Sequence, residues 1–526
     1  MKKITLSIIL MTATLASWAQ INTTLSLNYG GPGYDQMDRF YQAADGGYYW
    51  CGHTKMAGGN IPIVFGNDDA WFMKVDANGD SIHSAVFGGS GYDYLKDVLE
   101  VDDTTYVLLL NSNSTDNGFA GGAGNYDVWI KGYNFTPELS SGLPFGGTAN
   151  DIAIRITPRI MGGFLVTGTT WSSNGSLDGN YGNSDIWLMS LQPNLTIAWS
   201  KHFGGSSNDD GIAAYQLADG NIMLFGNSAS TNNDVDDHIG NNDVWVVKLN
   251  SMGDILWTKS YGGTNADVIF EVKYLSDTTF ALVGASNSND GNFMFRDRVP
   301  SFFGFYYVID ENGDYVNGGS MNTLDNYAMF FTDVCFDSPN YAMAFGVTNS
   351  DSIFNCSDPN HGDHDICIVD YNGIIDITTH LLGGDDDEGV TSGNAKYVKA
   401  VKTGTNTYAF CTNTRSTNLS TNFHGLMDVW LNVFEYQYAS IDEFNTSQLH
   451  VYPNPSNGQF YINVNGMDGI AEMNIYSISG QIIYSEQIDC TKLINKPMDI
   501  SAFSKGIYFI RLVNKNASHT EKIIIE

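Results

Sequence analysis

The sequence has little glutamate and little basic charge. Of its 58 acidic residues only 11 are Glu and 47 are Asp, whose short carboxylate favours turns and helix caps over helix interiors. Residues 20–448 hold 17 Lys and Arg against 51 Asp and Glu, a net charge of −34. A body this acidic repels phosphate backbones, so we expect no nucleic-acid partner. Together with 56 Gly, the composition predicts a turn-rich, all-β chain.

Long hydrophobic runs are also absent after the first twenty residues, so we expect no transmembrane segment. Residues 1–19 are typical of a signal peptide: Lys2 and Lys3 are basic, residues 4–15 are mostly apolar, and Ser17-Trp18-Ala19 provides small residues at a cleavage site. Cleavage after Ala19 would release a soluble protein into the periplasm or beyond.

The sequence lacks the common catalytic motifs. It contains no Gly-x-Ser-x-Gly, no Gly-x-x-x-x-Gly-Lys-Ser/Thr and no His-Glu-x-x-His, which argues against a serine hydrolase, a nucleotide-binding loop and a zinc protease. Hydrolysis by paired carboxylates leaves no such signature and stays open. The six cysteines do not form a dense disulfide framework, although Cys356 and Cys367 flank one loop and either pair or stay buried as thiols.

A repeat of 58 residues dominates the chain. An aromatic residue followed by Gly-Gly recurs at this interval, and degenerate copies follow at Asn317-Gly318-Gly319 and Leu382-Gly383-Gly384. The five regular copies begin at Tyr29, Phe87, Phe145, Phe203 and Tyr261. A second series, Asp-x-Trp, has the same spacing and returns near the end of the array. It comprises Asp69/Trp71, Asp127/Trp129, Asp185/Trp187, Asp243/Trp245 and Asp428/Trp430. Periods of this length indicate propellers or solenoids.

One repeat contains four short strands joined by turns, as residues 206–263 show. No part of the array has a sustained helical period, which excludes helical solenoids. Seven repeats of four antiparallel strands predict a seven-bladed β-propeller over residues 20–438. Residues 21–31 resemble an isolated fourth strand, whereas the last repeat has only three. The N-terminal strand is therefore expected to complete the last blade and close the ring.

Repeated aspartates are candidate metal ligands. One Asp lies six residues after each aromatic mark, close to the predicted central channel, where a ring of carboxylates could hold a structural Ca²⁺. These residues are Asp35, Asp93, Asp151, Asp209 and Asp267. Stabilisation of a turn is the alternative that we prefer for them, and for the Asp of the Asp-x-Trp series as well. The Trp of that series is expected to pack between neighbouring sheets. No other cofactor is expected.

The connections between second and third strands are long and polar, and they share one face with the blade-to-blade connections. That face is where recognition is expected. Trp171, Tyr181 and Phe119 are aromatic residues in these loops that could stack on sugar rings. Arg296 and Arg298 depart from the acidic consensus of the same face and are further candidates for binding.

The composition changes after a linker at residues 439–448. Residues 449–526 are nearly neutral and alternate as short strands, which predicts a small β-sandwich. Its motifs are Val451-Tyr452-Pro453-Asn454-Pro455, Ile478-Ser479-Gly480-Gln481, Asp499-Ile500-Ser501, Lys505-Gly506-Ile507-Tyr508-Phe509 and Lys522-Ile523-Ile524-Ile525. They resemble the type A C-terminal sorting domain of the type IX secretion system. The resemblance implies an Ig-like fold and recognition by the secretion machinery through Pro453, Asn454, Pro455, Gly480, Gln481, Gly506, Tyr508 and Lys522. It also implies export through the periplasm to the surface of a Gram-negative bacterium, or secretion.

Two functions fit the sequence. The regular repeats and the missing catalytic motifs favour a non-enzymatic protein for binding or adhesion that recognises a glycan or a protein through the long-loop face. The alternative is a propeller-fold polysaccharide hydrolase or lyase, and it predicts a deep pocket with converging acids or arginines at the channel mouth.

Overall fold

The chain is built from antiparallel strands, as predicted from its composition. The computed structural model describes residues 20–525 except positions 136–141, 143, 161, 177–178, 277, 294–300, 322, 324–326, 339–340, 351–352, 354–355, 357–363, 373–375, 390–397, 420–421, 438–447, 453, 466–468, 478–480, 490–493 and 515–517. The described residues form strands, bridges and turns and include no helix. They divide into two compact units, one from Ile21 to Tyr436 and one that contains the C-terminal strands.

The N-terminal unit contains a series of sheets, numbered here I to VII in chain order. Sheet I contains β2 (Asp35–Gln42), β3 (Tyr48–Thr54), β4 (Asp69–Val75) and β5 (Ser81–Phe87). Sheet II contains β6 (Asp93–Asp102), β7 (Thr105–Ser112) and β8 (Asp127–Tyr133). Sheet III contains β9 (Asp151–Pro158), β10 (Phe164–Thr170), β11 (Asp185–Leu191) and β12 (Ile197–Phe203). Sheet IV contains β13 (Asp209–Gln216), β14 (Ile222–Ser228), β15 (Asp243–Leu249) and β16 (Ile255–Tyr261).

The later sheets keep the same order of strands. Sheet V contains β17 (Asp267–Ser276), β18 (Thr279–Ser286), β19 (Phe303–Asp310) and β20 (Tyr315–Met321). Sheet VI contains β21 (Met329–Ser338), β22 (Tyr341–Thr348), β23 (Asp365–Asn372) and β24 (Asp376–Leu382). Sheet VII contains β25 (Val398–Gly404), β26 (Thr407–Thr414), β27 (Asp428–Gln437) and β1 (Gln20–Tyr29). In sheet II, Phe145 makes an isolated antiparallel bridge to Val128, where the other sheets have their outer strand.

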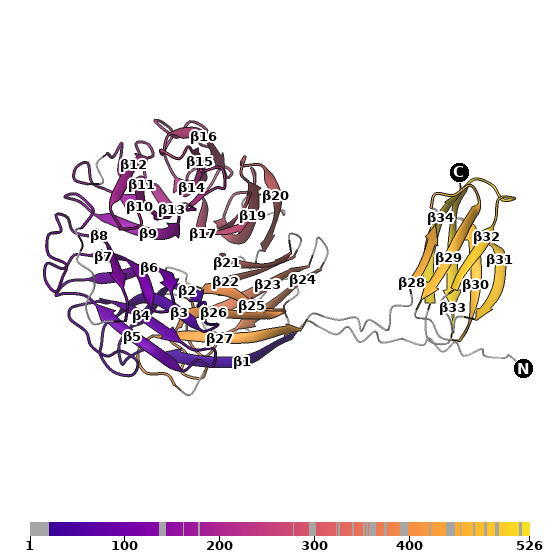
Figure 1. Cartoon of the computed structure of the whole chain (residues 1–526), viewed down its shortest axis with the longest axis horizontal. Coiled ribbons are helices and arrows are strands. Elements are labelled where there is room, and N and C mark those ends of the chain that lie inside the picture. Colours follow the sequence, from indigo (N-terminus) through magenta and orange to yellow (C-terminus); the bar gives the residue numbers. More distant parts are fainter. Residues whose placement is uncertain are drawn as a thin grey trace, which may run out of the picture. The chain divides into compact units, whose positions relative to one another are not determined.

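The sheets surround a common centre, and Figure 1 shows them arranged in a ring. The first strand of each sheet is the inner one: β2 contacts β6, and the contacts continue through β9, β13, β17, β21 and β25 back to β2. The prediction for the N-terminal strand is confirmed, because β1 lies beside β27 at the outer edge of sheet VII. The Thr24 hydroxyl donates to the Val433 carbonyl at 3.0 Å, and the Trp430 indole N–H donates to Ser26 Oγ at 2.9 Å.

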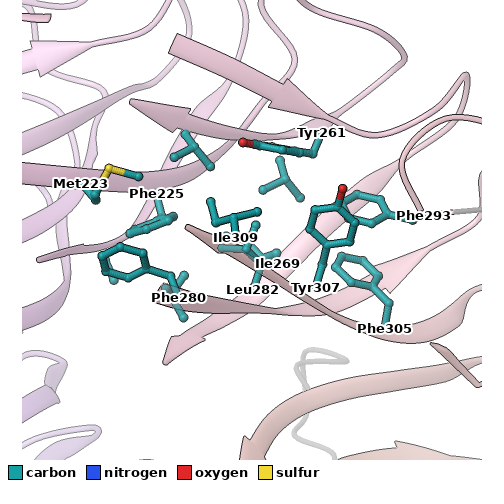
Figure 2. Packing of buried hydrophobic residues seen from close by; sticks show 14 of the residues in the cluster. Met223, Phe225, Tyr261, Ile269, Phe280, Leu282, Phe293, Phe305, Tyr307 and Ile309 are labelled. Carbon is teal, nitrogen blue, oxygen red and sulfur yellow. The ribbon is translucent and has the colours of Figure 1, made fainter. Parts of the chain in front are cut away.

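Hydrophobic side chains fill the spaces between neighbouring sheets. Figure 2 shows the cluster between sheets IV and V, in which Phe225 of β14 lies beside Phe280 of β18, and Phe305 stacks on Phe293 at the other end of the cluster. Similar clusters lie at five other joints, those between sheets I and II, II and III, III and IV, V and VI, and VII and I. Burial of this kind is worth roughly 25 cal/mol per Å² of apolar surface, so packing between the sheets stabilises the unit more than any single polar contact.

The Gly-Gly mark allows two chain segments to approach closely. Gly204 has a φ of 155°, and a Cβ added there would lie 2.6 Å from Oδ2 of Asp209 and 2.8 Å from Oδ1 of Asp185. Only glycine leaves space for both carboxylates at this crossing from sheet III to sheet IV. The repeated glycine is therefore explained by the repeated aspartates around it.

The C-terminal unit consists of two sheets around one core. The first contains β28 (Gln448–Tyr452), β29 (Gln459–Asn465) and β32 (Ile494–Asp499). The second contains β31 (Ile482–Asp489), β30 (Ile470–Ser477), β33 (Gly506–Val513) and β34 (Ser518–Ile525). Phe460, Ile475 and Ile510 are among the residues buried between them. The sequence did not reveal β32, whose residues Ile494-Asn495-Lys496-Pro497-Met498 lack a clear strand pattern.

Cysteines occur in these cores as thiols. Cys367 is fully buried in the cluster between sheets V and VI, and Cys356 packs against the same cluster. The pairing of these two residues that the sequence left open is therefore not adopted. Within the described part of the chain, no helix has the length and hydrophobicity needed to cross a bilayer.

Candidate functional site

One position of the repeat places charged side chains at the centre of the sheets. The inner strands β2 to β21 each contain a register shift, at which one residue is left out of the pairing with the second strand. The residues that follow these shifts are Arg39, Asp97, Arg155, Ala213, Glu271 and Asp333. Lys399 of β25 occupies the same position, because it pairs with Cys411 as Arg39 pairs with Cys51. We call the six charged members the central network.

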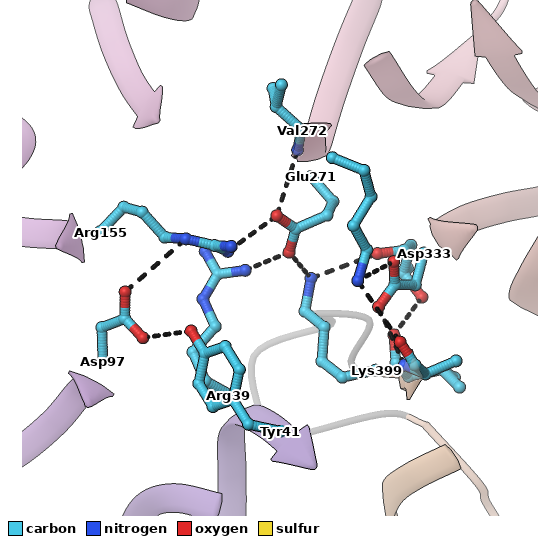
Figure 3. A network of polar contacts seen from close by, with 12 residues as sticks. Arg39, Tyr41, Asp97, Arg155, Glu271, Val272, Asp333 and Lys399 are labelled. Carbon is cyan, nitrogen blue, oxygen red and sulfur yellow. Dashed lines mark hydrogen bonds and ion pairs between the residues drawn. The ribbon is translucent and has the colours of Figure 1, made fainter. Parts of the chain in front are cut away.

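Glu271 is the hub of the central network, as Figure 3 shows. Its side chain is buried and forms ion pairs with Arg39 and Lys399 through Oε2. Arg155 Nη1 lies 2.8 Å from Oε1, and the Val272 N–H donates to the same oxygen at 3.1 Å. Three cations from sheets I, III and VII thus share one carboxylate from sheet V.

Two further carboxylates surround this hub. Asp97 of sheet II accepts hydrogen bonds from the Tyr41 hydroxyl at 2.5 Å and from the Ile156 N–H at 2.9 Å. Asp333 of sheet VI lies 2.8 Å from Lys273 Nζ and accepts a 2.9 Å hydrogen bond from the Ala400 N–H. Sheet IV, which has Ala213 at this position, is joined through the Tyr215 hydroxyl, which donates to the Val272 carbonyl at 2.8 Å. Polar contacts therefore connect each sheet to a neighbour or to the hub across the centre.

The charges of the central network determine which of its members can change protonation. Burial favours the neutral form of Glu271, but Arg155, Arg39 and Lys399 outweigh burial and hold the pKa of this carboxyl well below its usual range. Burial, together with the nearby Arg39 charge, lowers the pKa of Lys399 to about 8, although Glu271 acts in the opposite direction. Guanidinium groups stay charged at any physiological pH. Of the three cations around Glu271, Lys399 is therefore the one that loses its proton most easily.

A pocket of about 540 Å³ lies over the central network. Five of the six side chains left out at these register shifts line it: Asp38, Lys96, Ile154, Ile212 and Phe270. Arg39 and Lys399 belong to both the pocket and the network, so the network forms part of the pocket floor. Each of the seven inner strands contributes to the lining. The pocket lies near the start of these strands, which is the side of the long loops.

The pKa values of the two acids in the pocket, Asp38 and Asp210, are shifted in opposite directions. Burial would raise the pKa of Asp38, but the neighbouring Lys96 and His53 outweigh it and lower the pKa to about 2. Burial, followed by the charge of Asp209, raises the pKa of Asp210. Asp38 therefore stays an anion paired with Lys96, whereas Asp210 takes up a proton more readily than an ordinary carboxyl.

The predicted aromatic residues of the long loops lie in three different places. Trp171 is 39% exposed and lines the pocket. Tyr181 is exposed as well, but its ring lies 4.6 Å from that of His202 on β12, the outer strand of sheet III, and Tyr181 is not part of the pocket lining. Arg296 and Arg298 lie outside the described residues.

The prediction that Phe119 belongs to the binding face is wrong. Its side chain is 1% exposed, and its ring lies 5.4 Å from the ring of Trp129 in the core. Buried apolar residues occur at the same place in other long loops: Ile61, Val235 and Phe293. These positions differ by 58 residues or a multiple of 58, so the spacing could have identified Phe119 as a packing residue.

The five repeated aspartates at the start of the inner strands bind their own turns. Asp209 Oδ2 accepts hydrogen bonds from the Gly205 N–H and the Ser230 hydroxyl, both at 2.7 Å, while the Ser228 hydroxyl donates to Oδ1. Equivalent contacts surround the other four, Asp35, Asp93, Asp151 and Asp267. Among the residues that the structure describes, no three His, Cys, Asp or Glu side chains are grouped to hold a metal ion. These contacts stabilise the turns at the start of the inner strands.

The Asp-x-Trp pairs combine a loop contact with core packing. Asp243 accepts hydrogen bonds from the Ile239 and Gly240 N–H groups, both at 2.8 Å, and so holds the end of the long loop. Trp245 is fully buried in the cluster between sheets III and IV. The remaining tryptophans of the series, Trp71, Trp129, Trp187 and Trp430, are also buried.

Buried carboxyls predict a dependence of stability on pH. Burial raises the pKa of Asp35 to about 6, and it raises those of Asp185 and Glu388 to about 7. Because these folded-state values exceed the unfolded ones, their contribution to stability is complete below about pH 4 and is lost as the pH rises through 6 to 7. We expect a melting temperature several degrees higher at pH 5 than at pH 8, measured by differential scanning calorimetry.

The Asp185→Asn variant should weaken this dependence, because it removes one raised carboxyl. The exposed Asp219→Asn variant is the control and should keep the wild-type slope. A melting temperature that rises with pH would contradict the expectation. A chelator should leave the melting temperature unchanged at both pH values, since the turn contacts need no Ca²⁺.

The motifs at the C-terminus meet within the C-terminal unit. The Asn454 side chain donates to the Lys522 carbonyl at 2.6 Å and accepts from the Ile524 N–H at 3.0 Å. The first motif thereby completes the edge of β34, the last strand. Tyr508 on β33 donates its hydroxyl to the Ser504 carbonyl at 2.6 Å, and Gly506 pairs with Ile525. Pro455 follows Asn454, Gln481 closes a turn with Ser477, and Pro453 and Gly480 lie outside the described residues.

Comparison with known proteins finds a family match in the C-terminal unit and distant structural matches that extend over most of the chain. Curated proteins yield no match to the chain. Among solved structures, a puromycin hydrolase is 10% identical with a TM-score of 0.36, over 73% of this chain and 62% of the hydrolase. The chain thus spans less than two thirds of that enzyme. An apocarotenoid oxygenase variant from Synechocystis is 9% identical with a TM-score of 0.33, over 69% of this chain and 90% of the oxygenase.

A third structure is PorZ, a surface component of the type IX secretion system of Porphyromonas gingivalis. It is 11% identical with a TM-score of 0.13, over 97% of this chain and all of PorZ. Residues 450–526, in contrast, match the family described as the secretion system C-terminal sorting domain. The chain therefore carries a type IX sorting domain, and it is a protein that a Gram-negative bacterium exports to its surface or secretes.

Proposed function

We propose that this exported protein is a non-enzymatic binding protein that recognises a glycan in the pocket over the central network. The observation that carries the proposal is the lining of that pocket, to which all seven inner strands contribute. A site built on a rigid ring of strands holds its side chains in fixed positions, which favours selective recognition.

The fold that we propose for it is a seven-bladed β-propeller followed by an Ig-like sandwich. Sheets I to VII, the closed series of contacts between inner strands and the pairing of β1 with β27 support the propeller. The packing of a three-stranded on a four-stranded sheet supports the sandwich. We assign the propeller to residues 20–438, the linker to 439–448 and the sorting domain to 449–526, after a signal peptide at 1–19.

The chemistry of the pocket fits a saccharide. Trp171, Phe270 and Phe330 provide aromatic rings, on which the apolar face of a sugar can pack. Asp38, Asp210 and Lys96 provide acceptors and donors for hydroxyl groups. Ligand sites commonly combine such apolar walls with a few convergent polar groups.

A polysaccharide hydrolase or lyase is the second candidate. The opposite pKa shifts of Asp38 and Asp210 favour it, because a protonated and an ionised carboxyl are what general acid and base catalysis require. Against it, Asp38 is engaged by Lys96 and lies 3.7 Å from His53 Nδ1, so its carboxylate is not free to activate water. We therefore prefer binding without turnover.

Replacement of Trp171 by alanine tests the proposal. We expect the Trp171→Ala variant to lose about fivefold in affinity for a bound oligosaccharide, since an aromatic contact of this kind is worth roughly 1 kcal/mol. The ligand is first identified on a glycan array, and its affinity is then measured by isothermal titration calorimetry.

The matched control is Tyr181→Ala, which removes another exposed aromatic residue of the same loop that lies outside the pocket lining. Its affinity should equal that of the wild type. Equal losses in both variants would contradict a site at the pocket. Release of reducing or unsaturated sugar ends during the titration would instead establish the hydrolase or lyase.

A further inference from the structure

One position on the outer strands covers the joint between neighbouring sheets. Trp199 of β12 pairs with Ser190, and Trp257 of β16 pairs with Lys248, the equivalent residue of the next sheet. Trp199 packs against the cluster between sheets III and IV, and Trp257 packs against the cluster between sheets IV and V. The two indole rings therefore occupy the same space at successive joints.

Other sheets vary this position. His83 of β5, which pairs with Lys74, places an imidazole there, and its ring stacks on that of Phe135 at 4.3 Å. In sheet V the position belongs to Asn317, which pairs with Val308, and in sheet VI to Thr378. Sheet V thus has no aromatic side chain at the position that Trp199 and Trp257 occupy in the two preceding sheets.

A second difference on the same strand removes a long side chain beside Asn317. The long side chains of Lys201 and Lys259 stand two residues after Trp199 and Trp257, but Gly319 takes their place in β20. A Cβ at Gly319 would lie 2.6 Å from the Tyr306 ring and 2.7 Å from the Tyr371 ring, so these rings require the glycine. The outer strand of sheet V consequently carries neither of the bulky side chains that cover the two preceding joints.

A pocket of about 540 Å³ is present where these side chains are missing. Its lining includes Leu275, Val308, Val316, Asn317, Val334 and Phe336, from sheets V and VI. The pocket lies at the ends of β17 and β21, opposite the starts of these strands, where the saccharide pocket is found.

We propose that this second pocket binds a neutral, planar aromatic molecule of about the size of indole. The preceding joints show that the space accepts such a ring, since the protein's own Trp199 and Trp257 provide one there. The charged groups at the pocket have partners already: Lys273 pairs with Asp333, and Asp337 pairs with Lys402 and accepts from the Tyr408 hydroxyl at 2.9 Å. No unpaired charge therefore calls for a charged ligand, and the apolar lining favours a neutral one.

Indole itself is the probe, added to the full-length protein. We expect saturable binding to one site in isothermal titration calorimetry, and a melting temperature that rises with indole concentration. The Asn317→Trp variant should lose at least tenfold in affinity, because its own side chain fills the space. It should also melt a few degrees higher without ligand, as filling a cavity stabilises a fold.

Two further variants keep the test decisive. Leu256→Trp adds an indole at an exposed position of β16 and should leave the affinity unchanged. Trp257→Ala should create a second binding site at the joint between sheets IV and V, so that two indole molecules bind, and this outcome does not depend on whether Asn317→Trp folds. The absence of saturable binding to the wild type would overturn the proposal, as would an unchanged affinity in folded Asn317→Trp or a single site in Trp257→Ala.

Discussion

Replacing Glu271 by glutamine is expected to lower the free energy of unfolding by about 3–5 kcal/mol, the usual cost of removing one partner from a buried ion pair. The amide has nearly the shape of the carboxylate but no charge. Arg39, Arg155 and Lys399 would then lie at the centre of the sheets without the anion that they share. Urea unfolding, followed by tryptophan fluorescence, measures the loss as a shift of the transition midpoint.

The matched control is Glu435→Gln on β27, whose side chain is exposed and which should change stability by no more than about 0.5 kcal/mol. The Glu271→Gln/Lys399→Met double variant should recover part of the loss, because one of the three cations is removed with the anion. Equal midpoints for Glu271→Gln and the control would show that the hub does not stabilise the ring.

Removal of residues 20–29 should have the second large effect. These residues form β1, and without them β27 becomes an exposed edge strand. The cluster between sheets VII and I also loses the buried Tyr29 and the packing of Leu25 and Leu27. We expect the truncated protein to unfold at least 10 °C below the full-length protein and to associate in solution, since an unpaired edge invites pairing with other chains. Calorimetry and light scattering measure the two effects.

Addition of a synthetic peptide with the sequence of residues 20–29 provides the control. It should restore most of the melting temperature, because strand addition to an open sheet edge recovers both the hydrogen bonds and the apolar contacts. A peptide in which Leu25 and Leu27 are replaced by Asp should fail to do so. Truncated protein that melts like the full-length chain would contradict a closing role for β1.

The repeating framework was predictable because it depends on constant residues. The aromatic-Gly-Gly and Asp-x-Trp series recur every 58 residues, and each serves the same contact in every sheet: Gly204 allows the approach of two carboxylates, and Trp245 fills a joint. A contact that recurs in every sheet requires the same residue type at the same place in every repeat, so it is visible in the sequence as a constant residue at a constant spacing. The closing role of β1 followed from the same count of strands.

The central network could not be predicted in this way. Its position is constant, four residues after each repeated Asp in the first five sheets, but its residues are Arg39, Asp97, Arg155, Ala213 and Glu271. Charges of both signs and an alanine at one position look like unconstrained variation in a single sequence. Their role appears only when the ring brings them together, because three cations and three carboxylates from different sheets then balance one another.

For Phe119 the sequence misled in the opposite direction, because a packing residue looked like a binding residue. Taken alone, a phenylalanine in a long polar loop resembles a ligand contact, whereas compared with Ile61, Val235 and Phe293 it is one of a series of apolar anchors. Trp171 differs because no aromatic residue stands 58 residues before or after it, where the sequence has Asn113 and Ala229. Deviation from the repeat was therefore the better guide to the binding pocket.

Because of their register shifts, the inner strands use different residues to line the pocket and to pair with the neighbouring strand. Asp38, Lys96, Ile154, Ile212 and Phe270 face the pocket but take no part in strand pairing. Such a residue can be exchanged at little cost to the ladder beside it. Five such substitutions could give the protein a new ligand preference while its architecture stays intact, so this scaffold is well suited to diversification, in natural evolution and in engineering alike.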